Sequence, residues 1–188
     1  MNFPFGRLTS STIPEAVNLV GTNCPTTYSY DANGNLTSKT APLENQFLTC
    51  TSTATTTYGY DALNRLTSKT YSDKTPPANY YYDQSTVTIG SWTSTTLTNP
   101  KGRMTEATIT ASGSINTALV YSYDAMGRPV NFWQCDPSNC GSASIWKIPY
   151  TYDLAGDVTS YTHMDGYTIS TPVNAAQQVT SVQSTSNP

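Results

Sequence analysis

Short runs of alternating polar and apolar residues, separated by turn-forming residues, recur along this chain. In "YSYDANGNLTSKT", residues 28–40, two tyrosines flank a serine, the alternation expected of a strand with one buried face. Asp31 can accept hydrogen bonds from the backbone amides that follow it, and Asn-Gly34 tolerates the left-handed backbone of a tight turn. The closing "LTSKT" resumes the alternation. The segment therefore predicts a β-hairpin.

The same pattern recurs at a spacing typical of repeat proteins. The copy "YGYDALNRLTSKT" is nearly identical, whereas weaker copies keep the second half of the pattern and lose the tyrosine. Repeats lie near residues 3–12, 28–40, 58–70, 98–108, 121–130, 150–160 and 173–182. The shared positions are a tyrosine, an aspartate and a turn Gly or Asn: Tyr30, Asp31, Gly34, Tyr60, Asp61, Asn64, Gly102, Tyr123, Asp124, Gly127, Tyr152, Asp153 and Gly156. We expect the aspartates to hold the turns and the tyrosines to stack as a continuous ladder on one face of a sheet.

Composition supports an all-β fold. Ser and Thr account for 54 of the 188 residues, Tyr for 14, and charged residues for 11%. The nearest candidate for a helix, "TIPEAVNLV" at 12–20, is short. We predict a repetitive antiparallel β-hairpin ribbon or β-solenoid-like array over residues 1–188, in which each repeat buries its apolar face on its neighbours.

The rhythm is interrupted over residues 71–97. Pro76-Pro77 predicts a connection, and Val87 to Ile89 predicts an alternating strand. Tyr82-Asp83 resembles another repeat, but no Gly or Asn turn follows it at the usual offset. We predict a longer hairpin or an extra strand here.

Four cysteines favour disulfides. Cys135 and Cys140 flank "DPSN", which suits a tight turn, and Cys24 and Cys50 precede two consecutive tyrosine strands. An even number of cysteines in a chain rich in Thr and Ser fits an oxidising, extracellular compartment. Zinc-bound thiolates and free buried thiols are the alternatives, although the spacings lack the paired C-x₂-C of zinc sites.

Candidate residues for catalysis or ligand binding are few. His163, the only histidine, lies near Asp165 and many serines, but no nucleophile elbow accompanies them. The repeated aspartates share one turn position, which predicts turn caps rather than paired glycosidase carboxylates, and the turns lack the acidic density of calcium loops. We expect no enzyme activity, cofactor or metal. Trp92, Trp133 and Trp146 are candidate glycan contacts, with packing between strands as the favoured alternative.

The charge balance of 9 basic against 12 acidic residues argues against nucleic-acid binding. No apolar run approaches about twenty residues, so membrane insertion is not expected. The first ten residues, "MNFPFGRLTS", carry no cleavable signal. The targeting segment of a secreted parent would therefore lie outside this chain.

The Tyr-Asp pairs resemble the tyrosine–aspartate (YD) repeats of RHS proteins and teneurins. Each pair is followed by a Gly or Asn turn and, in most copies, by a "[LV]TS" strand, and the resemblance covers nearly the whole chain. It is carried by Tyr30-Asp31, Tyr60-Asp61, Tyr123-Asp124 and Tyr152-Asp153. The resemblance implies a long ribbon of antiparallel hairpins that spirals into a hollow shell on bacterial secreted or surface proteins. In many members the shell encloses a C-terminal toxin or carries cell-surface contacts.

One departure from the family concerns its self-cleaving "DPxG" segment, which does not occur here; the only Asp-Pro is Asp136-Pro137. The chain also begins and ends inside a repeat, so we expect a piece of a repeat array. Its expected role is a non-catalytic shell wall, stalk or self-associating filament, with other copies or the remainder of a shell as partners. The alternative is a carbohydrate-binding or cell-surface adhesion module.

Overall fold

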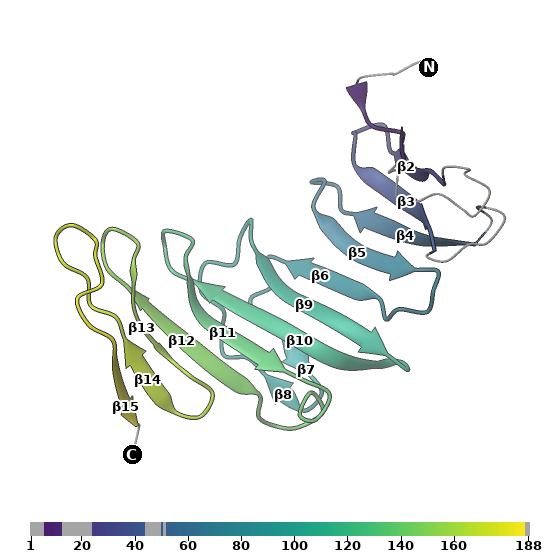
Figure 1. Cartoon of the computed structure of the whole chain (residues 1–188). Coiled ribbons are helices and arrows are strands. Elements are labelled where there is room, and N and C mark those ends of the chain that lie inside the picture. Colours follow the sequence, from purple (N-terminus) through teal and green to yellow (C-terminus); the bar gives the residue numbers. More distant parts are fainter. Residues whose placement is uncertain (1–5, 13–23, 44–49, 51, 187–188) are drawn as a thin grey trace. The chain divides into compact units, whose positions relative to one another are not determined.

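A computed structural model of the chain describes residues 6–12, 24–43, 50 and 52–186, and its regular elements are β-strands (Figure 1). The candidate helix at 12–20 lies almost wholly outside the described residues, as does the start of the repeat at 3–12. The strands are β1 (Ser10–Ser11), β2 (Thr26–Tyr30), β3 (Leu36–Pro42), β4 (Thr53–Tyr60), β5 (Leu66–Tyr71), β6 (Ala78–Tyr82), β7 (Thr88–Ile89), β8 (Trp92–Thr93), β9 (Met104–Ala111), β10 (Ser114–Tyr123), β11 (Pro129–Cys135), β12 (Trp146–Tyr152), β13 (Val158–Thr162), β14 (Tyr167–Ser170) and β15 (Gln183–Ser186).

The strand order confirms the predicted all-β hairpin fold. Thirteen of the described strands are hydrogen-bonded in the order β1-β2-β3-β4-β5-β6-β9-β10-β11-β12-β13-β14-β15, and β7 pairs with β8 separately. Neighbours in the sheet are therefore neighbours along the chain, apart from the β7–β8 excursion. The chain divides into two compact units, an N-terminal unit of Met1–Asn79 and a C-terminal unit of Tyr80–Pro188.

The N-terminal unit consists mainly of the hairpins β2–β3 and β4–β5. The two hairpins share one register, because Tyr28 pairs with Lys39 and Tyr58 pairs with Lys69. In each hairpin the register shifts directly before the repeat tyrosine. The hairpins β10–β11 and β12–β13 shift at the same position. This recurring irregularity locally increases strand twist next to the turn.

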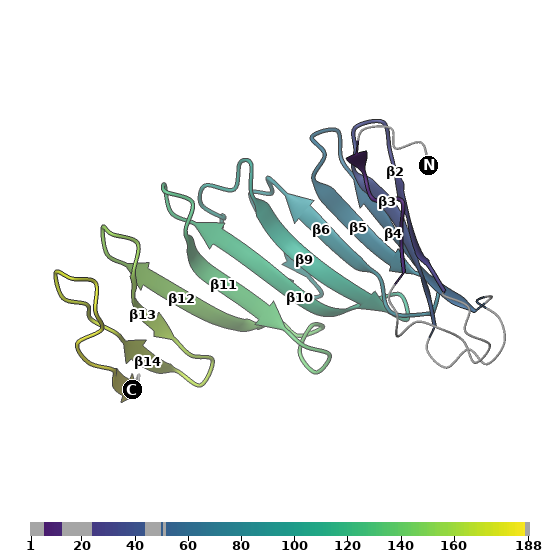
Figure 2. The same cartoon turned by 45° about the horizontal axis from the view of Figure 1, so that its top comes forward.

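The C-terminal unit contains the hydrophobic core. Along β10, Ala118 and Val120 face one side of the sheet, and the β7–β8 excursion supplies Ile89 against that side. Figure 2 shows the turns that follow β10 and β12 at one edge of this unit. The complete buried cluster is Val87, Ile89, Leu97, Ala118, Val120, Trp133, Cys135, Cys140 and Ile145.

The irregular segment 71–97 contains the strands β6, β7 and β8, and it interrupts a repeat. The N–H of Asp83 donates to the Arg103 carbonyl at 3.1 Å, and the N–H of Gly102 donates to Asp83 Oδ1 at 2.5 Å. In continuous repeats the corresponding partners lie within four residues of the aspartate. Asp83 and the turn near 99–103 therefore form one repeat, although the sequence pattern separates them. The segment between them is an insertion that carries β7 and β8.

Candidate functional site

The same hydrogen bonds close each Tyr-Asp turn. The N–H of Asp61 donates to the Arg65 carbonyl at 3.0 Å, and the N–H of Asn64 donates to the Asp61 carbonyl at 3.0 Å. The carboxylate Oδ1 of Asp61 accepts the N–H groups of Leu63 and Arg65, both at 2.9 Å. The two backbone hydrogen bonds recur in the turns that begin at Asp31, Asp124 and Asp153. In each of these turns the N–H of the residue four positions after the aspartate also donates to its carboxylate.

The fourth residue of each continuous turn has a left-handed backbone. The angle φ is +93° at Gly34, +60° at Asn64, +87° at Gly127 and +103° at Gly156. Gly102, in the interrupted repeat, has φ of +76°. The choice of Gly or Asn at this position follows from the steric cost of this conformation for other residues.

The residue that follows the left-handed position completes the site, and it was not among the predicted site residues. Arg65 Nε donates to Asp61 Oδ2 at 2.7 Å, and Arg128 Nε donates to Asp124 Oδ2 at 2.6 Å. The backbone hydrogen bonds from these arginines, followed by their side chains, hold the pKa of Asp61 and Asp124 below its ordinary value. One pattern in the sequence could have indicated these arginines: a Gly-Arg or Asn-Arg dipeptide occurs four times.

Arginines of the turns also contact the following hairpin. The guanidinium carbon of Arg128 lies 4.6 Å from the ring centroid of Tyr152, and Arg128 Nη1 donates to the Asp153 carbonyl at 2.8 Å. Such contacts combine charge–ring attraction with a charge-assisted hydrogen bond. The ring contact recurs in two other pairs, Arg7 with Tyr30 at 5.8 Å and Arg103 with Tyr123 at 5.6 Å.

The repeat tyrosines contact the preceding repeat through their hydroxyl groups. Each hydroxyl donates to a backbone carbonyl near the start of the preceding returning segment. The pairs are Tyr30 with Leu8 (2.9 Å), Tyr60 with Leu36 (3.0 Å), Tyr123 with Met104 (2.5 Å) and Tyr152 with Pro129 (2.7 Å). Burial raises the pKa of Tyr60, Tyr123 and Tyr152.

This arrangement differs from the predicted continuous stack of tyrosines. In the described residues, the aromatic pairs on this face join Tyr121 with Tyr123 and Phe132, and Tyr150 with Tyr161. Repeat tyrosines of successive hairpins are not among these pairs. Instead, an arginine from the preceding turn lies over the rings of Tyr30, Tyr123 and Tyr152.

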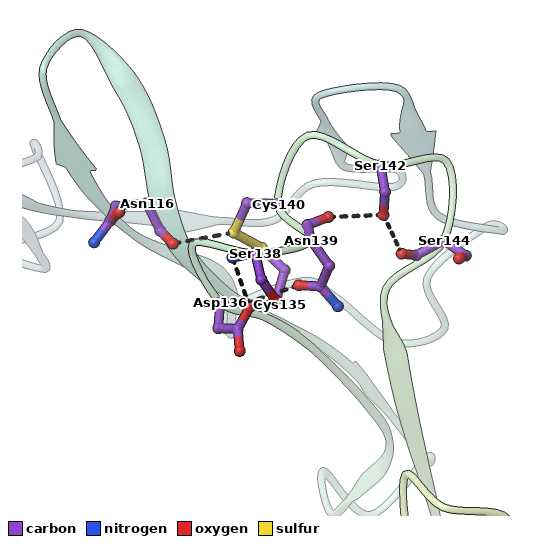
Figure 3. The surroundings of a disulfide bond; sticks show 8 residues. All are labelled: Asn116, Cys135, Asp136, Ser138, Asn139, Cys140, Ser142 and Ser144. Carbon is purple, nitrogen blue, oxygen red and sulfur yellow. Dashed lines mark hydrogen bonds between the residues drawn. A yellow bond between two sulfur atoms is a disulfide. The ribbon is translucent and has the colours of Figure 1, made fainter.

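The four cysteines form the two pairs considered from the sequence. Cys24 bonds to Cys50, and Cys135 bonds to Cys140 across the loop after β11 (Figure 3). In that loop, Asp136 Oδ1 accepts the Ser138 N–H at 2.8 Å. A hydrogen bond from the Ser138 side chain is the main cause of the lowered pKa of Asp136. Because all four cysteines are oxidised, none is available as a thiolate ligand for zinc.

Two of the three candidate glycan-contact tryptophans pack inside the C-terminal unit. Trp133 is 6% exposed, and its ring centroid lies 6.0 Å from that of Trp92. Trp146 pairs with Gln134 and is only partly buried. Gln134 directly follows Trp133 in β11, so Trp146 lies on the opposite face of the sheet from Trp133.

His163 lies in the exposed turn between β13 and β14. Its Nδ1 is 3.0 Å from Asp165 Oδ2. Among the described residues, no hydrogen bond joins a serine hydroxyl to this histidine, so a catalytic triad is not assembled. The same part of the chain contains no group of three His, Cys, Asp or Glu side chains arranged to hold a metal ion. It also contains no helix long and apolar enough to span a membrane.

Comparison with known proteins gives no family assignment. No family model matches the chain, and no curated protein matches it. Among solved structures, TcdB2-TccC3-Cdc42 is similar over 96% of this chain and 11% of that chain, at 16% identity and a TM-score of 0.42. TcdB2-TccC3-TEV is similar over 95% and 11%, at 17% identity and a TM-score of 0.42. A porin-like protein from Bacteroides uniformis ATCC 8492 is similar over 87% and 88%, at 14% identity and a TM-score of 0.27. This chain spans about a tenth of the length of the first two.

Proposed function

We propose that the chain is a non-catalytic structural segment of an RHS-type secreted or cell-surface protein, where its hairpins build a shell wall, a stalk or a self-associating filament. The observation that carries the proposal is the pair of contacts between successive repeats. A tyrosine hydroxyl bonds to the preceding repeat, and a turn arginine covers the tyrosine of the following one. Because these contacts recur, the same two contacts can join further hairpins to the array.

The environment of the repeated carboxylates supports a non-catalytic role. Asp61 and Asp124 each accept backbone amides of their own turn and an arginine Nε. General acid–base catalysis favours a group whose pKa is near the working pH, whereas these two aspartates have lowered pKa values. The repetition of one environment fits caps better than paired catalytic groups.

The two disulfides support secretion into an oxidising compartment. The carbohydrate-binding alternative has less support, because Trp133 is buried and Trp92 packs against it. Assembly through a sheet edge is better supported. β15 is an edge strand of the described sheet, and its four side chains are exposed. Unprotected edges recruit further strands.

Light scattering coupled to size exclusion, over a concentration series of the full chain under non-reducing conditions, tests self-association. Negative-stain imaging of the same fractions then shows whether the particles are regular. We expect particles that grow with concentration. A β-rich protein that stays monomeric throughout would contradict the filament and favour a wall or stalk that needs the rest of its parent.

Two lysine variants locate the assembling surface. Ser184→Lys puts a charge on the exposed edge strand β15, and charged side chains on edges oppose strand addition. Ala143→Lys puts the same charge in an exposed loop outside the strands. We expect assembly to be lost in the first variant and kept in the second. Equal assembly by both would exclude this edge as the route.

A further inference from the structure

One cluster of buried polar side chains lies outside the Tyr-Asp contacts. Thr105 is 0% exposed and Glu106 is 6% exposed, in consecutive positions near the start of β9. Gln84 lies at the start of the insertion. Thr105 Oγ1 donates to Gln84 Oε1 at 2.7 Å, and Gln84 Nε2 donates to Glu106 Oε2 at 3.0 Å. A hydroxyl and a carboxylate, both buried, therefore contact the two ends of one carboxamide.

The donors and acceptors determine the orientation of this carboxamide. An ionised Glu106 only accepts hydrogen bonds, so the amide nitrogen of Gln84 faces it and the carbonyl oxygen faces the Thr105 hydroxyl. The backbone N–H of Gln84 also donates to Thr105 Oγ1 at 3.4 Å, and Thr105 Oγ1 lies 3.3 Å from the Tyr81 carbonyl oxygen. Main-chain groups thus help to hold the hydroxyl beside the carboxamide, as an intramolecular reaction requires.

We propose that Thr105 and Gln84 form an intramolecular ester cross-link, with Glu106 as the catalytic residue that transfers the proton. Thr105 Oγ1 bonds to Gln84 Cδ, the Cδ–Nε2 bond breaks, and ammonia leaves. The hydroxyl proton passes to Gln84 Oε1, to which it is hydrogen-bonded. The Glu106 carboxyl delivers a proton to the departing Nε2, which it contacts, and it recovers the proton from Oε1 as the carbonyl forms again. One hydroxyl and one carboxamide become one ester and one ammonia, so no oxidant or cofactor is consumed.

The surroundings of Glu106 suit this step. Burial raises the pKa of its carboxyl, and the hydrogen bond from Gln84 opposes the rise. A carboxyl with a raised pKa exchanges protons more readily near neutral pH than an exposed one. Burial of Thr105 and Glu106 also excludes water, which protects the resulting ester from hydrolysis.

The cross-link would join the two ends of the insertion. Gln84 and Thr105 are 21 positions apart, one at each side of the segment that carries β7 and β8. In this interrupted repeat, the insertion separates Asp83 along the chain from the turn that it contacts, whereas in the other repeats the two are adjacent. An ester at this place would supply a short covalent connection between them, independently of the function proposed above.

Mass spectrometry of the purified full chain tests the proposal directly. We expect an intact mass lower by one ammonia than that of the disulfide-bonded sequence. Trypsin cleaves after Lys and Arg but not before Pro129, so the ester would join peptides 75–101 and 104–147. Hydroxylamine should separate them, because it cleaves esters. A succinimide at Asn33-Gly34 has the same mass loss but leaves these two peptides separate.

Three variants identify the reacting groups. Thr105→Val keeps the shape of the side chain without the nucleophile and should abolish the link, whereas Thr105→Ser keeps the hydroxyl and should retain it. Glu106→Gln should slow or abolish the reaction in a chain whose circular dichroism is unchanged. The proposal is wrong if the folded wild-type chain has its full mass and the two peptides are separate, whatever the variants do. It is also wrong if the link persists in Thr105→Val.

Discussion

The N-terminal and C-terminal units contain the same Tyr-Asp turn but differ in what covers the sheet. In the C-terminal unit, β7 and β8 cover one side of the sheet and create a cluster of fully buried side chains. In the described part of the N-terminal unit, Cys24 is the only buried residue of the hydrophobic class. The repeated residues are thus sufficient to shape a hairpin, whereas the buried cluster forms where the insertion packs against the sheet.

The two units also differ in the interactions that hold them together. Turn caps, tyrosine hydroxyls and one disulfide stabilise the N-terminal hairpins. The C-terminal unit adds apolar burial, which is the larger contribution per residue. All three tryptophans lie in the C-terminal unit. Tryptophan fluorescence therefore reports that unit, and far-UV circular dichroism reports both.

The largest expected effect is loss of the C-terminal core. Ile89 is 0% exposed, so Ile89→Ala should lower the free energy of unfolding by about 2–5 kcal/mol through lost burial and a cavity. Urea titration followed by tryptophan fluorescence measures it. Leu36→Ala, at a half-buried position of the N-terminal unit, is the matched variant and should leave this transition in place. A shift of similar size in both would mean that the units unfold together.

Removal of the Cys24–Cys50 bond should have the next largest effect, in the N-terminal unit. For a separation of 26 residues, chain entropy alone predicts a loss of about 3.5 kcal/mol. Thermal unfolding of the Cys24→Ala/Cys50→Ala double variant, followed by circular dichroism, should show an earlier first transition. The tryptophan transition should stay unchanged, and an equal shift there would contradict separate stabilisation of the units.

Two turn glycines separate backbone strain from contacts between repeats. A Cβ at Gly127 would lie 2.8 Å from Arg103 Nη2, whereas a Cβ at Gly102 would meet nothing within 4 Å. Both residues have positive φ, so each change to Ala should cost about 1–2 kcal/mol. Gly127→Ala should cost more than Gly102→Ala in urea titrations, because Arg103 must also move from the Tyr123 ring. Equal costs would show that this cation–ring contact adds nothing.

The tyrosine hydroxyls are tested by removing one oxygen. Tyr123→Phe keeps the ring but loses the hydrogen bond to the Met104 carbonyl, so it should lower the free energy of unfolding by about 1 kcal/mol. Tyr121→Phe is the matched control, because the Tyr121 hydroxyl forms no hydrogen bond among the residues that the structure describes. Identical urea midpoints for the two variants would remove the hydroxyl contact from the account of how repeats are joined.

The smallest effect is a pH dependence with opposite signs in two places. The folded-state pKa of Asp61 and Asp124 is lowered, so their contribution is present above the ordinary aspartate pKa and lost as pH falls through the folded value. The folded-state pKa of Glu106 is raised, so its contribution is complete below the ordinary glutamate pKa and lost as pH rises through the folded value. The measurement is the urea midpoint as a function of pH. Its pH dependence should become weaker at acidic pH in Asp124→Asn and weaker at higher pH in Glu106→Gln. A slope unchanged in either variant would contradict that assignment.

The sequence was most informative where the determinants are local. The alternation around Tyr28 and Tyr30 predicted a strand, and the residues from Asp31 to Gly34 predicted a turn with a left-handed position. These features depend on steric and hydrogen-bonding preferences within a few residues. The sequence also contained the Gly-Arg and Asn-Arg dipeptides, but nothing local indicates that Arg128 contacts a tyrosine 24 positions further along the chain.

Contacts between distant segments were decided by the tertiary structure alone. Asp83 meets Gly102 across an insertion, and the same insertion brings Ile89 onto β10 and Gln84 against Thr105. An offset along the chain cannot reveal such partners, because hydrogen bonds and burial depend on distance in space. By itself, therefore, this sequence determined its strands and turns through local backbone preferences. Only the folded chain determined which face is covered and which buried groups meet.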